Sequence, residues 1–331
     1  MKVFITGATG FFGRALARTL LAGGAERVVL FSRSESRQAA VAERLHEYPN
    51  ARFRRGDMRD RDRLEEAMWG CDAVVHCAAL KRVDAVADNP GEVRKTNVVG
   101  SANVIAAARA IGASKVLMIS SDKAASPSTS YGASKAQMEH EAIASNTITI
   151  SRGLRVSCTR WGNVLRSTGS VTEIWLDQLR RGAPITVTEP TMTRFVISRQ
   201  QAVDFCLTAL QAMEGGELFI PRLPATTVRD LLRATAILHG ADIDPEGVQI
   251  VGARPGGEKH DELLITGDEA SRAWARGDTV TVLPSPHAWR ETFSPPSGAI
   301  PCRGAYSSDQ PSRWVGVDDL VSLLKETDPD E

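Results

Sequence analysis

The chain has 331 residues, of which 42% are hydrophobic and 24% are charged, so it can bury a full core and is long enough for a large domain with a smaller partner. Its 40 basic residues balance its 40 acidic ones, which excludes a bulk charge that would attract nucleic acid or an anionic membrane. Five scattered cysteines without a CxxC spacing exclude a disulfide framework and a zinc site, and we expect no metal.

The sequence shows no targeting or membrane-spanning segment. Residues 1–6 lead directly into a strand-like run, and no apolar stretch approaches the roughly 18 residues that a membrane span requires. We therefore expect a cytoplasmic protein that neither enters nor spans a membrane.

Short β-branched runs alternate with longer helical patterns through the first half of the chain. We expect helices at 14–23 and 96–112 and strands at 2–6, 27–32, 51–57, 73–78, 115–120 and 155–162. This alternation predicts βαβ crossovers, and hence an α/β protein with a doubly wound parallel sheet, the Rossmann type.

Three glycines follow the first predicted strand in the run "TGATGFFG". They form a GxxGxxG turn that leads into an amphipathic helix, an arrangement that brings a pyrophosphate to the backbone and to the helix N-terminus. Such turns also join strands to helices without a ligand, but the position at the first βα turn favours a dinucleotide. The expected cofactor contacts are Gly7, Thr9, Gly10, Phe11, Phe12 and Gly13.

The end of the second predicted strand indicates which dinucleotide binds. NAD-binding chains usually place a carboxylate there for the ribose 2′-hydroxyl, whereas this chain has Ser32, Arg33 and Arg37. These donors suit a 2′-phosphate and favour NADP, although the arginines could also be ordinary solvated charges. Further cofactor contacts are expected after the later strands, from Asp57, Met58, Ala78, Ala79, Lys81 and Asn97.

The pattern becomes less regular after Val164. Residues 166–175 and 184–195 look like loops around short elements, 198–213 like a helix and 217–222 like a strand, while 267–309 gives no secondary-structure prediction. We predict an NADP-binding domain from residues 1–164 plus about 196–222. The smaller, interleaved substrate domain would comprise about 165–195 plus 223–331.

The stretch "SDKAASPSTSYGASK", residues 121–135, contains a candidate catalytic group. The pKa of a tyrosine is about 10, and Lys135 lies four residues after Tyr131 on the same helical face, where its charge would lower that pKa. Tyr131 and Lys135 can therefore transfer a proton while an alcohol is oxidised, and both are expected to contact the cofactor. YxxxK alone is common on exposed helices, but the glycine turn and Asn97 strengthen its interpretation as a catalytic pair.

Ten motifs together resemble the extended short-chain dehydrogenase/reductases. The resemblance is closer to the short, soluble, inverting UDP-N-acetylglucosamine 4,6-dehydratases (5-epimerising), and it runs nearly end to end. In the related membrane-bound retaining enzymes a methionine replaces the tyrosine, so Tyr131 points to the inverting branch. The motifs are "TGATGFFG", "FSRSESRQ", "GDMRD", "CAALKRV", "KTNVVGSANVI", "SSDKAASPSTSYGASK", "RWGNVLRSTGSV", "TMTRF", "GARPGGEKHDELL" and "YSSDQPSRWVGVDDL".

The resemblance implies a lyase reaction in three steps. Oxidation at C4 gives a ketone that acidifies H5, water is lost across C5–C6, and hydride returns to C6, so a tightly bound NADP is recycled. Tyr131 with Lys135 would act in the oxidation, Asp122 would protonate the departing C6 hydroxyl, and Lys123 would remove H5. A lysine acts as a base at neutral pH only if its pKa falls by about three units, and a neighbouring ionised Asp122 opposes that fall.

The resemblance also implies a partner and an assembly. The substrate would be UDP-GlcNAc or a close UDP-hexose, and the inverted product would be UDP-2-acetamido-2,6-dideoxy-L-arabino-hex-4-ulose. Family members form homo-oligomers, often hexamers. The chain departs from the family pattern at Trp161, at Arg166 and Thr168 in "RSTGSV", and in "RPGGEKHDE", where Glu258 is shifted by one place relative to Arg254. The implied substrate contacts are Lys81, Asn163, Arg194, Arg254 and Glu258.

Two other interpretations stay open. The first is a UDP-sugar 4-epimerase or 5,6-dehydratase, which uses the same fold and the same oxidised C4 intermediate; the Asp122–Lys123 pair argues against simple 4-epimerisation, which needs no acid at C6. The second is a regulatory protein that binds NADP without catalysis. The presence of both Tyr131 and Lys135 argues against it.

Overall fold

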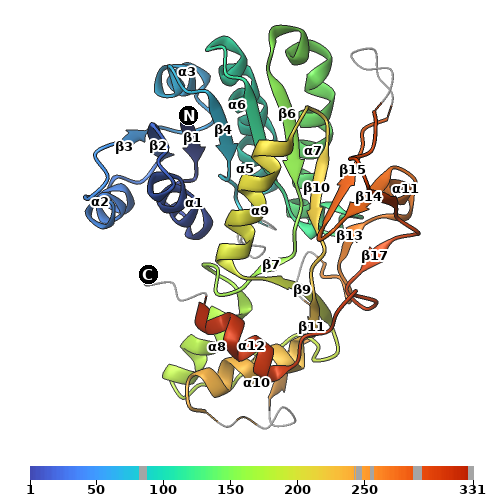
Figure 1. The fold of residues 1–331 in the computed structure, drawn as a ribbon. Coiled ribbons are helices and arrows are strands. Elements are labelled where there is room, and N and C mark those ends of the chain that lie inside the picture. Colours follow the sequence, from blue (N-terminus) through green and yellow to red (C-terminus); the bar gives the residue numbers. More distant parts are fainter. Residues whose placement is uncertain (82–87, 242, 244–247, 254–256, 286–292, 327–331) are drawn as a thin grey trace.

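A ten-stranded sheet forms the centre of the protein (Figure 1), seen in a computed structural model that describes residues 1–81, 88–241, 243, 248–253, 257–285 and 293–326. Seven of its strands are parallel, in the order β3-β2-β1-β4-β5-β6-β10. They are β1 (Lys2–Thr6), β2 (Arg27–Ser32), β3 (Ala51–Arg55), β4 (Ala73–His76), β5 (Lys115–Ile119), β6 (Arg155–Thr159) and β10 (Leu218–Pro221). The strand order reverses between β1 and β4, which creates a ligand-binding crevice at their carboxyl ends and confirms the predicted doubly wound fold.

Three strands from the C-terminal third extend this sheet. β15 (Thr279–Val282) pairs antiparallel with β10, and β14 (Ala273–Arg276) and β16 (Ile300–Pro301) continue outward. The sequence predicted no structure for this region, and the predicted domain division placed it in the substrate domain. The hydrogen-bonding edge of β10 is covered because β15 pairs with it.

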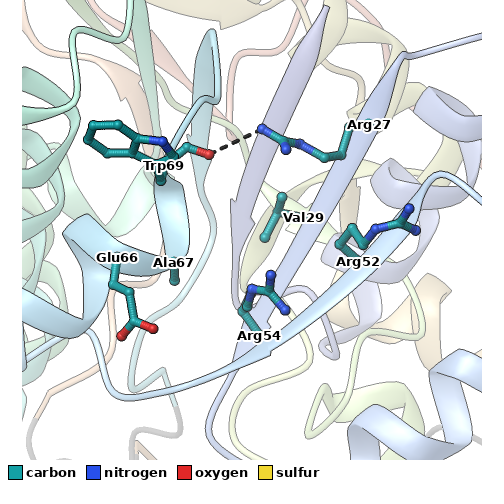
Figure 2. A pocket seen from close by; sticks show the side chains of 7 residues that line it. All are labelled: Arg27, Val29, Arg52, Arg54, Glu66, Ala67 and Trp69. Carbon is teal, nitrogen blue, oxygen red and sulfur yellow. Dashed lines mark hydrogen bonds between the residues drawn. The ribbon is translucent and has the colours of Figure 1, made fainter.

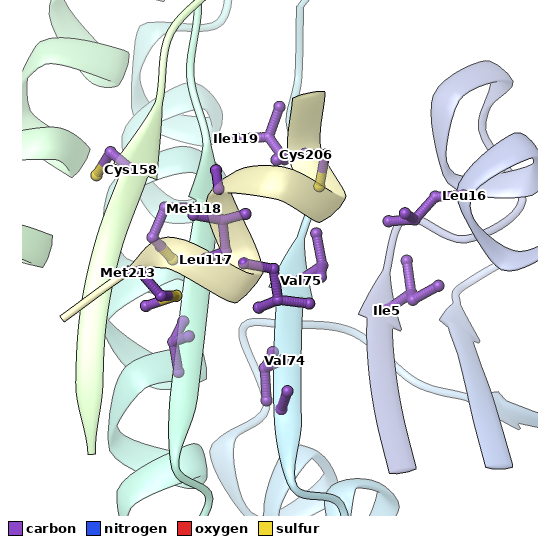
Figure 3. Close-up of a cluster of buried hydrophobic side chains, with 14 of the residues drawn as sticks. Ile5, Leu16, Val74, Val75, Leu117, Met118, Ile119, Cys158, Cys206 and Met213 are labelled. Atoms are coloured by element: carbon purple, nitrogen blue, oxygen red, sulfur yellow. The ribbon is translucent and has the colours of Figure 1, made fainter. Parts of the chain in front are cut away.

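Helices cover both faces of the sheet. α3 (Arg61–Met68), α6 (Gly100–Ala110) and α7 (Ser130–Thr149) pack together on one face, and α1 (Phe11–Ala22) and α9 (Arg199–Ala212) on the other. α2 (Glu35–Arg44) lies beside β3, and α5 (Pro90–Val93) continues through the π-helical turn Arg94–Val99 into α6. Figure 3 shows the main core, where Cys206 of α9 and Met213, which directly follows this helix, lie against Met118 and its neighbours in β5.

A second core lies at the carboxyl ends of the parallel strands (Figure 1). It is formed by α8 (Val171–Arg180), α10 (Val228–Leu238) and α12 (Val317–Glu326). The sequence indicated a loop over 166–175, but α8 begins within it. Trp175 explains why, because its ring is fully buried and its Nε1 donates to the Thr186 carbonyl at 2.9 Å.

Short strands join the two cores. β9 (Thr193–Ile197) pairs with β7 (Asn163–Val164) and β11 (Ala225–Thr227), β8 (Thr186–Val187) with β12 (Gln249–Ile250), and β13 (Leu263–Ile265) with β17 (Tyr306–Ser307). The short helix α11 (Gly267–Ala270) follows β13. β13 packs beside the turn Asp122–Ala124, so a C-terminal segment reaches the carboxyl end of β5. Within the described residues, no helix is long and apolar enough to cross a membrane.

Candidate active site

The glycine turn after β1 has no room for side chains. Gly7 has a φ of +64°, and a Cβ added to it would lie 2.9 Å from Ala78 Cα. A Cβ on Gly13 would lie 2.5 Å from the Gly7 carbonyl oxygen. The backbone at the start of α1 is therefore open to a ligand, as a pyrophosphate requires.

A cleft of about 790 Å³ extends from this turn along the carboxyl ends of the parallel strands. Sixteen of the predicted cofactor contacts line it, namely Gly7, Thr9, Gly10, Phe11, Phe12, Gly13, Ser32, Arg33, Arg37, Asp57, Met58, Ala78, Ala79, Lys81, Tyr131 and Lys135. Asn97 is not among the lining residues. Its side chain is buried and hydrogen-bonds the Leu80 N–H at 2.8 Å, the Leu80 carbonyl at 2.9 Å and the Ser134 hydroxyl at 3.0 Å. Asn97 therefore braces the loop after β4 against α7.

One end of the cleft is rich in arginine and has no carboxylate at the end of β2. Arg14, Arg33, Arg37 and Arg44 line this end, and the buried Ser32 hydroxyl has no hydrogen-bond partner among the described residues. Among the described residues that line the cleft, the carboxylate is that of Asp57, which follows β3 instead. Burial would raise the pKa of Asp57, but hydrogen bonds and charge from Arg59 outweigh burial and lower it. This end of the cleft thus suits an anionic group attached to a ribose.

Tyr131 and Lys135 both face the cleft from the first turns of α7. The Thr129 hydroxyl caps this helix by accepting from the Gly132 N–H at 3.0 Å. Burial raises the pKa of Tyr131 to about 12, and the charge that opposes this rise is that of Lys123. Burial lowers the pKa of Lys135 to about 8, and its amine donates to the Ile119 carbonyl at 2.7 Å. The charge of Lys123 thus lowers the pKa of Tyr131, and the effect expected of Lys135 on Tyr131 stays a prediction.

Asp122 lies behind the wall of the cleft rather than on it. Its side chain is 0% exposed, and its Oδ1 accepts from the Ser121 hydroxyl at 2.8 Å and from Lys123 Nζ at 2.9 Å. Its Oδ2 has no hydrogen-bond partner among the described residues. Burial raises the pKa of Asp122 more than the charge of Lys123 lowers it. A raised pKa agrees with the predicted role as an acid.

Lys123 lines the cleft and is held by three acceptors. Its Nζ lies 2.9 Å from Asp122 Oδ1, 3.1 Å from Asn163 Oδ1 and 3.3 Å from Glu262 Oε1. Burial lowers its pKa, but the two carboxylates outweigh burial and raise the pKa well above the ordinary lysine value. This direction is opposite to what the predicted base role requires. In the free protein Lys123 is a cation whose N–H groups are all engaged.

The predicted substrate contacts divide into two groups. Lys81 and Asn163 line the cleft, and Lys81 Nζ lies 3.4 Å from the Ser167 hydroxyl. Arg194 and Glu258 do not line it but pair with each other, with Nη2 and Oε1 3.0 Å apart. Arg254 lies outside the described residues. The site therefore brings two of the five together on the cleft wall.

Glu262 is a site residue that the sequence reasoning missed. It immediately precedes β13, is 3% exposed, and contacts Lys123 from the side opposite the cleft. Its motif, "GARPGGEKHDELL", was recognised, but the predicted role went to Glu258. Only the position of a second glutamate at the end of that motif could have indicated it.

A second cavity lies away from this site, on the sheet face between β2, β3 and α3. It measures about 460 Å³ and is lined by Arg27, Arg52, Arg54, Glu66 and Trp69 with Val29 and Ala67 (Figure 2). Arg27 and Arg52 donate to backbone carbonyls at its edge. None of the predicted site residues lies in it.

The chain matches the family described as "Polysaccharide biosynthesis protein" over residues 3–283. The inverting UDP-N-acetylglucosamine 4,6-dehydratase of Campylobacter jejuni subsp. jejuni is 33% identical over 338 residues, which cover 99% of this chain and 98% of the relative. A UDP-glucose 4-epimerase of Rickettsia conorii is 38% identical over 276 residues, or 82% of this chain and 79% of the relative.

Solved structures share the fold. The X-ray structure of Pen from Bacillus thuringiensis has a TM-score of 0.90 and 32% identity, and it covers 98% of this chain and 97% of its own. DesIV, a dTDP-glucose 4,6-dehydratase from Streptomyces venezuelae solved with NAD and TYD bound, has a TM-score of 0.71 and 25% identity over 78% of this chain and 86% of its own. The match to Pen extends over both cores.

Proposed function

The chain belongs to the polysaccharide biosynthesis protein family, and from this premise we propose that it is a UDP-N-acetylglucosamine 4,6-dehydratase that inverts C5. One observation carries the proposal: the buried Asp122 is ion-paired with Lys123, which lines the same cleft as Tyr131. A dehydrogenase needs only the tyrosine and its lysine, here Tyr131 and Lys135. The adjacent carboxyl and amine supply the second proton-transfer pair that loss of water requires.

The cleft fits a nicotinamide cofactor, and NADP is the form that we propose. The side-chain-free turn at Gly7 and Gly13 would hold the pyrophosphate, and Ser32, Arg33 and Arg37 would hold the 2′-phosphate. When bound, the cofactor supplies a hydride acceptor for C4 and a hydride donor for C6 within one turnover.

Tyr131 is the proposed proton acceptor for the C4 hydroxyl. Because burial raises its pKa to about 12, it needs a nearby positive charge to act at neutral pH, and Lys123 provides one. Lys135 is fixed to the Ile119 carbonyl and faces the same cleft, so it is placed to hold the cofactor.

Asp122 and Lys123 are the proposed pair for the elimination. Asp122 holds the proton for the departing C6 hydroxyl, in line with its raised pKa, and Ser121 and Lys123 connect it to the cleft. Lys123 can take H5 only after passing its own proton to a neighbouring carboxylate, because an ammonium group has no lone pair. Because Asp122 already carries its proton, Glu262, whose Oε1 lies 3.3 Å from Lys123 Nζ, is the carboxylate that can receive it.

Incubation of the purified chain with UDP-GlcNAc and NADP in D₂O, followed by NMR, tests the function. We expect a C6 methyl group, deuterium at C5 and the L-arabino ring configuration of UDP-2-acetamido-2,6-dideoxy-L-arabino-hex-4-ulose. Unchanged UDP-GlcNAc would contradict the proposal. A product that retains the D configuration at C5 would support the dehydratase activity but contradict the inversion.

A UDP-sugar 4-epimerase is the second candidate, because the Rickettsia conorii relative has that name. An epimerase returns the hydride to C4 and leaves C5 and C6 untouched. In the same experiment it would give the C4 epimer without deuterium at C5 and without a methyl group. The Asp122–Lys123 pair favours the dehydratase.

The assembly and the compartment are also proposals. We propose a cytoplasmic homo-oligomer, with a hexamer as the expected form. Sedimentation equilibrium of the purified protein measures the oligomeric state. One chain has a mass of 35.7 kDa, and the mass of an oligomer is a multiple of that value.

A further inference from the structure

Lys123 is shared between two carboxylates that have different surroundings. Glu262 faces three cations, since Lys123 and Lys259 lie 3.3 Å and 3.4 Å from its oxygens and Arg194 also lowers its pKa. Asp122 faces one cation, Lys123, and its side chain is 0% exposed against 3% for Glu262, so burial outweighs the single opposite charge and raises its pKa. Of the two, Glu262 is the carboxylate that stays ionised.

The position of Glu262 is set by elements far from the Asp122–Lys123 turn. Its N–H donates to the Ser308 hydroxyl at 2.8 Å, and its carbonyl accepts from the Ser308 N–H at 2.9 Å, next to the β13–β17 pair. Lys259 Nζ donates to the Ala125 carbonyl, and a Cβ on Gly257 would lie 2.7 Å from the Ser128 carbonyl oxygen. The segment 257–262 is thus docked along 123–128, and Glu262 has little freedom to leave Lys123.

We propose that Glu262 is a positioning residue for the elimination, which serves as the counter-ion of Lys123 and thereby leaves Asp122 its proton for the departing hydroxyl. The inference rests on the proposed function. Glu262 does not line the cleft and acts through Lys123. Without it, Asp122 is the remaining counter-ion of Lys123 and loses its proton to solvent at neutral pH.

The other charged groups around Lys123 do not replace Glu262. Arg194 faces Lys123 as a like charge and is itself paired with Glu258. Lys81 is a second like charge on the cleft wall, and the phenol of Tyr131 is neutral at physiological pH. Among the described residues, Asp122 and Glu262 are the anions that act on Lys123.

The first test is a carboxyl titration of the wild-type protein, labelled with ¹³C at aspartate and glutamate carboxyls and assigned with Asp122→Asn and Glu262→Gln. We expect the pKa of Asp122 above the ordinary aspartate range and that of Glu262 below the ordinary glutamate range. In Glu262→Gln, the Asp122 pKa should fall by about one unit or more. The reverse order in the wild-type protein overturns the proposal, and Glu262→Asp can provide the assignment if the glutamine variant does not fold.

The second test is the pH dependence of dehydration. Glu262→Gln should lower kcat at pH 7 by about 100-fold and move the alkaline limb of the profile to lower pH, while Glu262→Asp keeps the limb in place. Glu269→Gln is the matched control, because Glu269 is an ion-paired, largely buried carboxylate that contacts Arg160 instead of Lys123. An unmoved limb in Glu262→Gln contradicts the role of Glu262.

The two tests separate the two proposals. The titrations do not involve UDP-GlcNAc. If they give the expected order of pKa values but the protein does not turn over UDP-GlcNAc, only the proposed function is rejected. Turnover of UDP-GlcNAc with the reverse titration order rejects only the role of Glu262.

Discussion

At the scale of single residues, Asp122 and Lys123 are neighbours in sequence but differ in access and in charge state. Lys123 lines the cleft as a cation with three acceptors, whereas Asp122 is fully buried with a raised pKa. The family resemblance identified both residues but not their protonation states, because those depend on burial and on Glu262, which comes from a distant segment.

Replacing Asp122 by Asn should separate oxidation from elimination. Asparagine keeps the shape and the hydrogen bond to Lys123 but has no acid proton, so we expect product formation to fall by about 10²–10⁴-fold. Because Tyr131 is untouched, oxidation at C4 continues and reduced nicotinamide accumulates, which near-ultraviolet absorbance measures. Asp261→Asn is the control, since Asp261 bonds Thr193 and His260 outside the cleft. Full turnover by Asp122→Asn would exclude Asp122 as the acid.

Replacing both Arg33 and Arg37 by Ser should remove the preference for NADP. Both arginines line the end of the cleft where β2 lacks a carboxylate, and each charged hydrogen bond to a phosphate is worth about 1.5–3 kcal/mol. At that value for each of the two arginines, calorimetry should give about a 10²-fold to 10⁴-fold weaker Kd for NADP and little change for NAD. Arg61→Ser, outside the cleft, is the control. Tighter binding of NAD than NADP by the wild-type chain would contradict the assignment.

At the scale of elements, the start of α7 is packed directly on the backbone of Lys123. A Cβ on Gly132 would collide with the Lys123 carbonyl oxygen, and Thr129 caps the helix at the same point. The YxxxK spacing alone predicted that Tyr131 and Lys135 share a helix face. The sequence pattern did not predict that this helix also positions Lys123, because the contact is between backbones.

Gly132→Ala should therefore lower both activity and stability. Alanine is favoured over glycine in a helix by about 1 kcal/mol, so helix propensity alone predicts stabilisation. The collision with the Lys123 carbonyl makes the substitution destabilising instead, since α7 or the Asp122–Ala124 turn must move. Thermal unfolding and turnover measure both effects. Gly91→Ala in α5, where a Cβ meets no atom within 4 Å, is the control and should not lose stability. Equal behaviour of the two variants would contradict this reasoning.

At the scale of the whole molecule, a buried histidine ties the centre of the sheet together. The His76 ring in β4 bonds the Thr6 hydroxyl of β1 at 2.7 Å and the Ser101 hydroxyl of α6 at 3.0 Å. Burial, helped by the charge of Lys135, lowers its pKa to about 3. The folded protein therefore keeps this ring neutral at pH values where the unfolded chain protonates it.

The free energy of unfolding should fall as the pH drops from about 6.5 to about 3. The unfolded histidine binds a proton below its pKa of about 6.5 and the folded one does not, so acid favours the unfolded chain across that window. Denaturant titrations at several pH values should show a shallower pH slope for His76→Gln than for the wild-type protein. His46→Gln, at an exposed position, should keep the wild-type slope. Equal slopes for all three proteins would exclude His76 as the cause.

The parallel half of the fold and most of the cofactor contacts were predictable because their signals are local. A strand, a glycine turn and an amphipathic helix are adjacent in the chain, and Tyr131 and Lys135 are one helical turn apart. The strands β14–β16 were not predictable, since short strands show little pattern until β10 offers an edge to pair with.

The assembly of the elimination site depends on contacts between distant residues. Glu262 reaches Lys123 across 139 positions of the chain because β13 pairs with β17 and the segment 257–262 docks on 123–128. The resemblance to the inverting dehydratases named Asp122 and Lys123 as the acid and the base. Their pKa values, however, follow from burial and from the charges that surround them, and both arise only when the segment 257–262 is docked on 123–128. The sequence thus specifies which groups are present, and the packing decides which of them carries the proton.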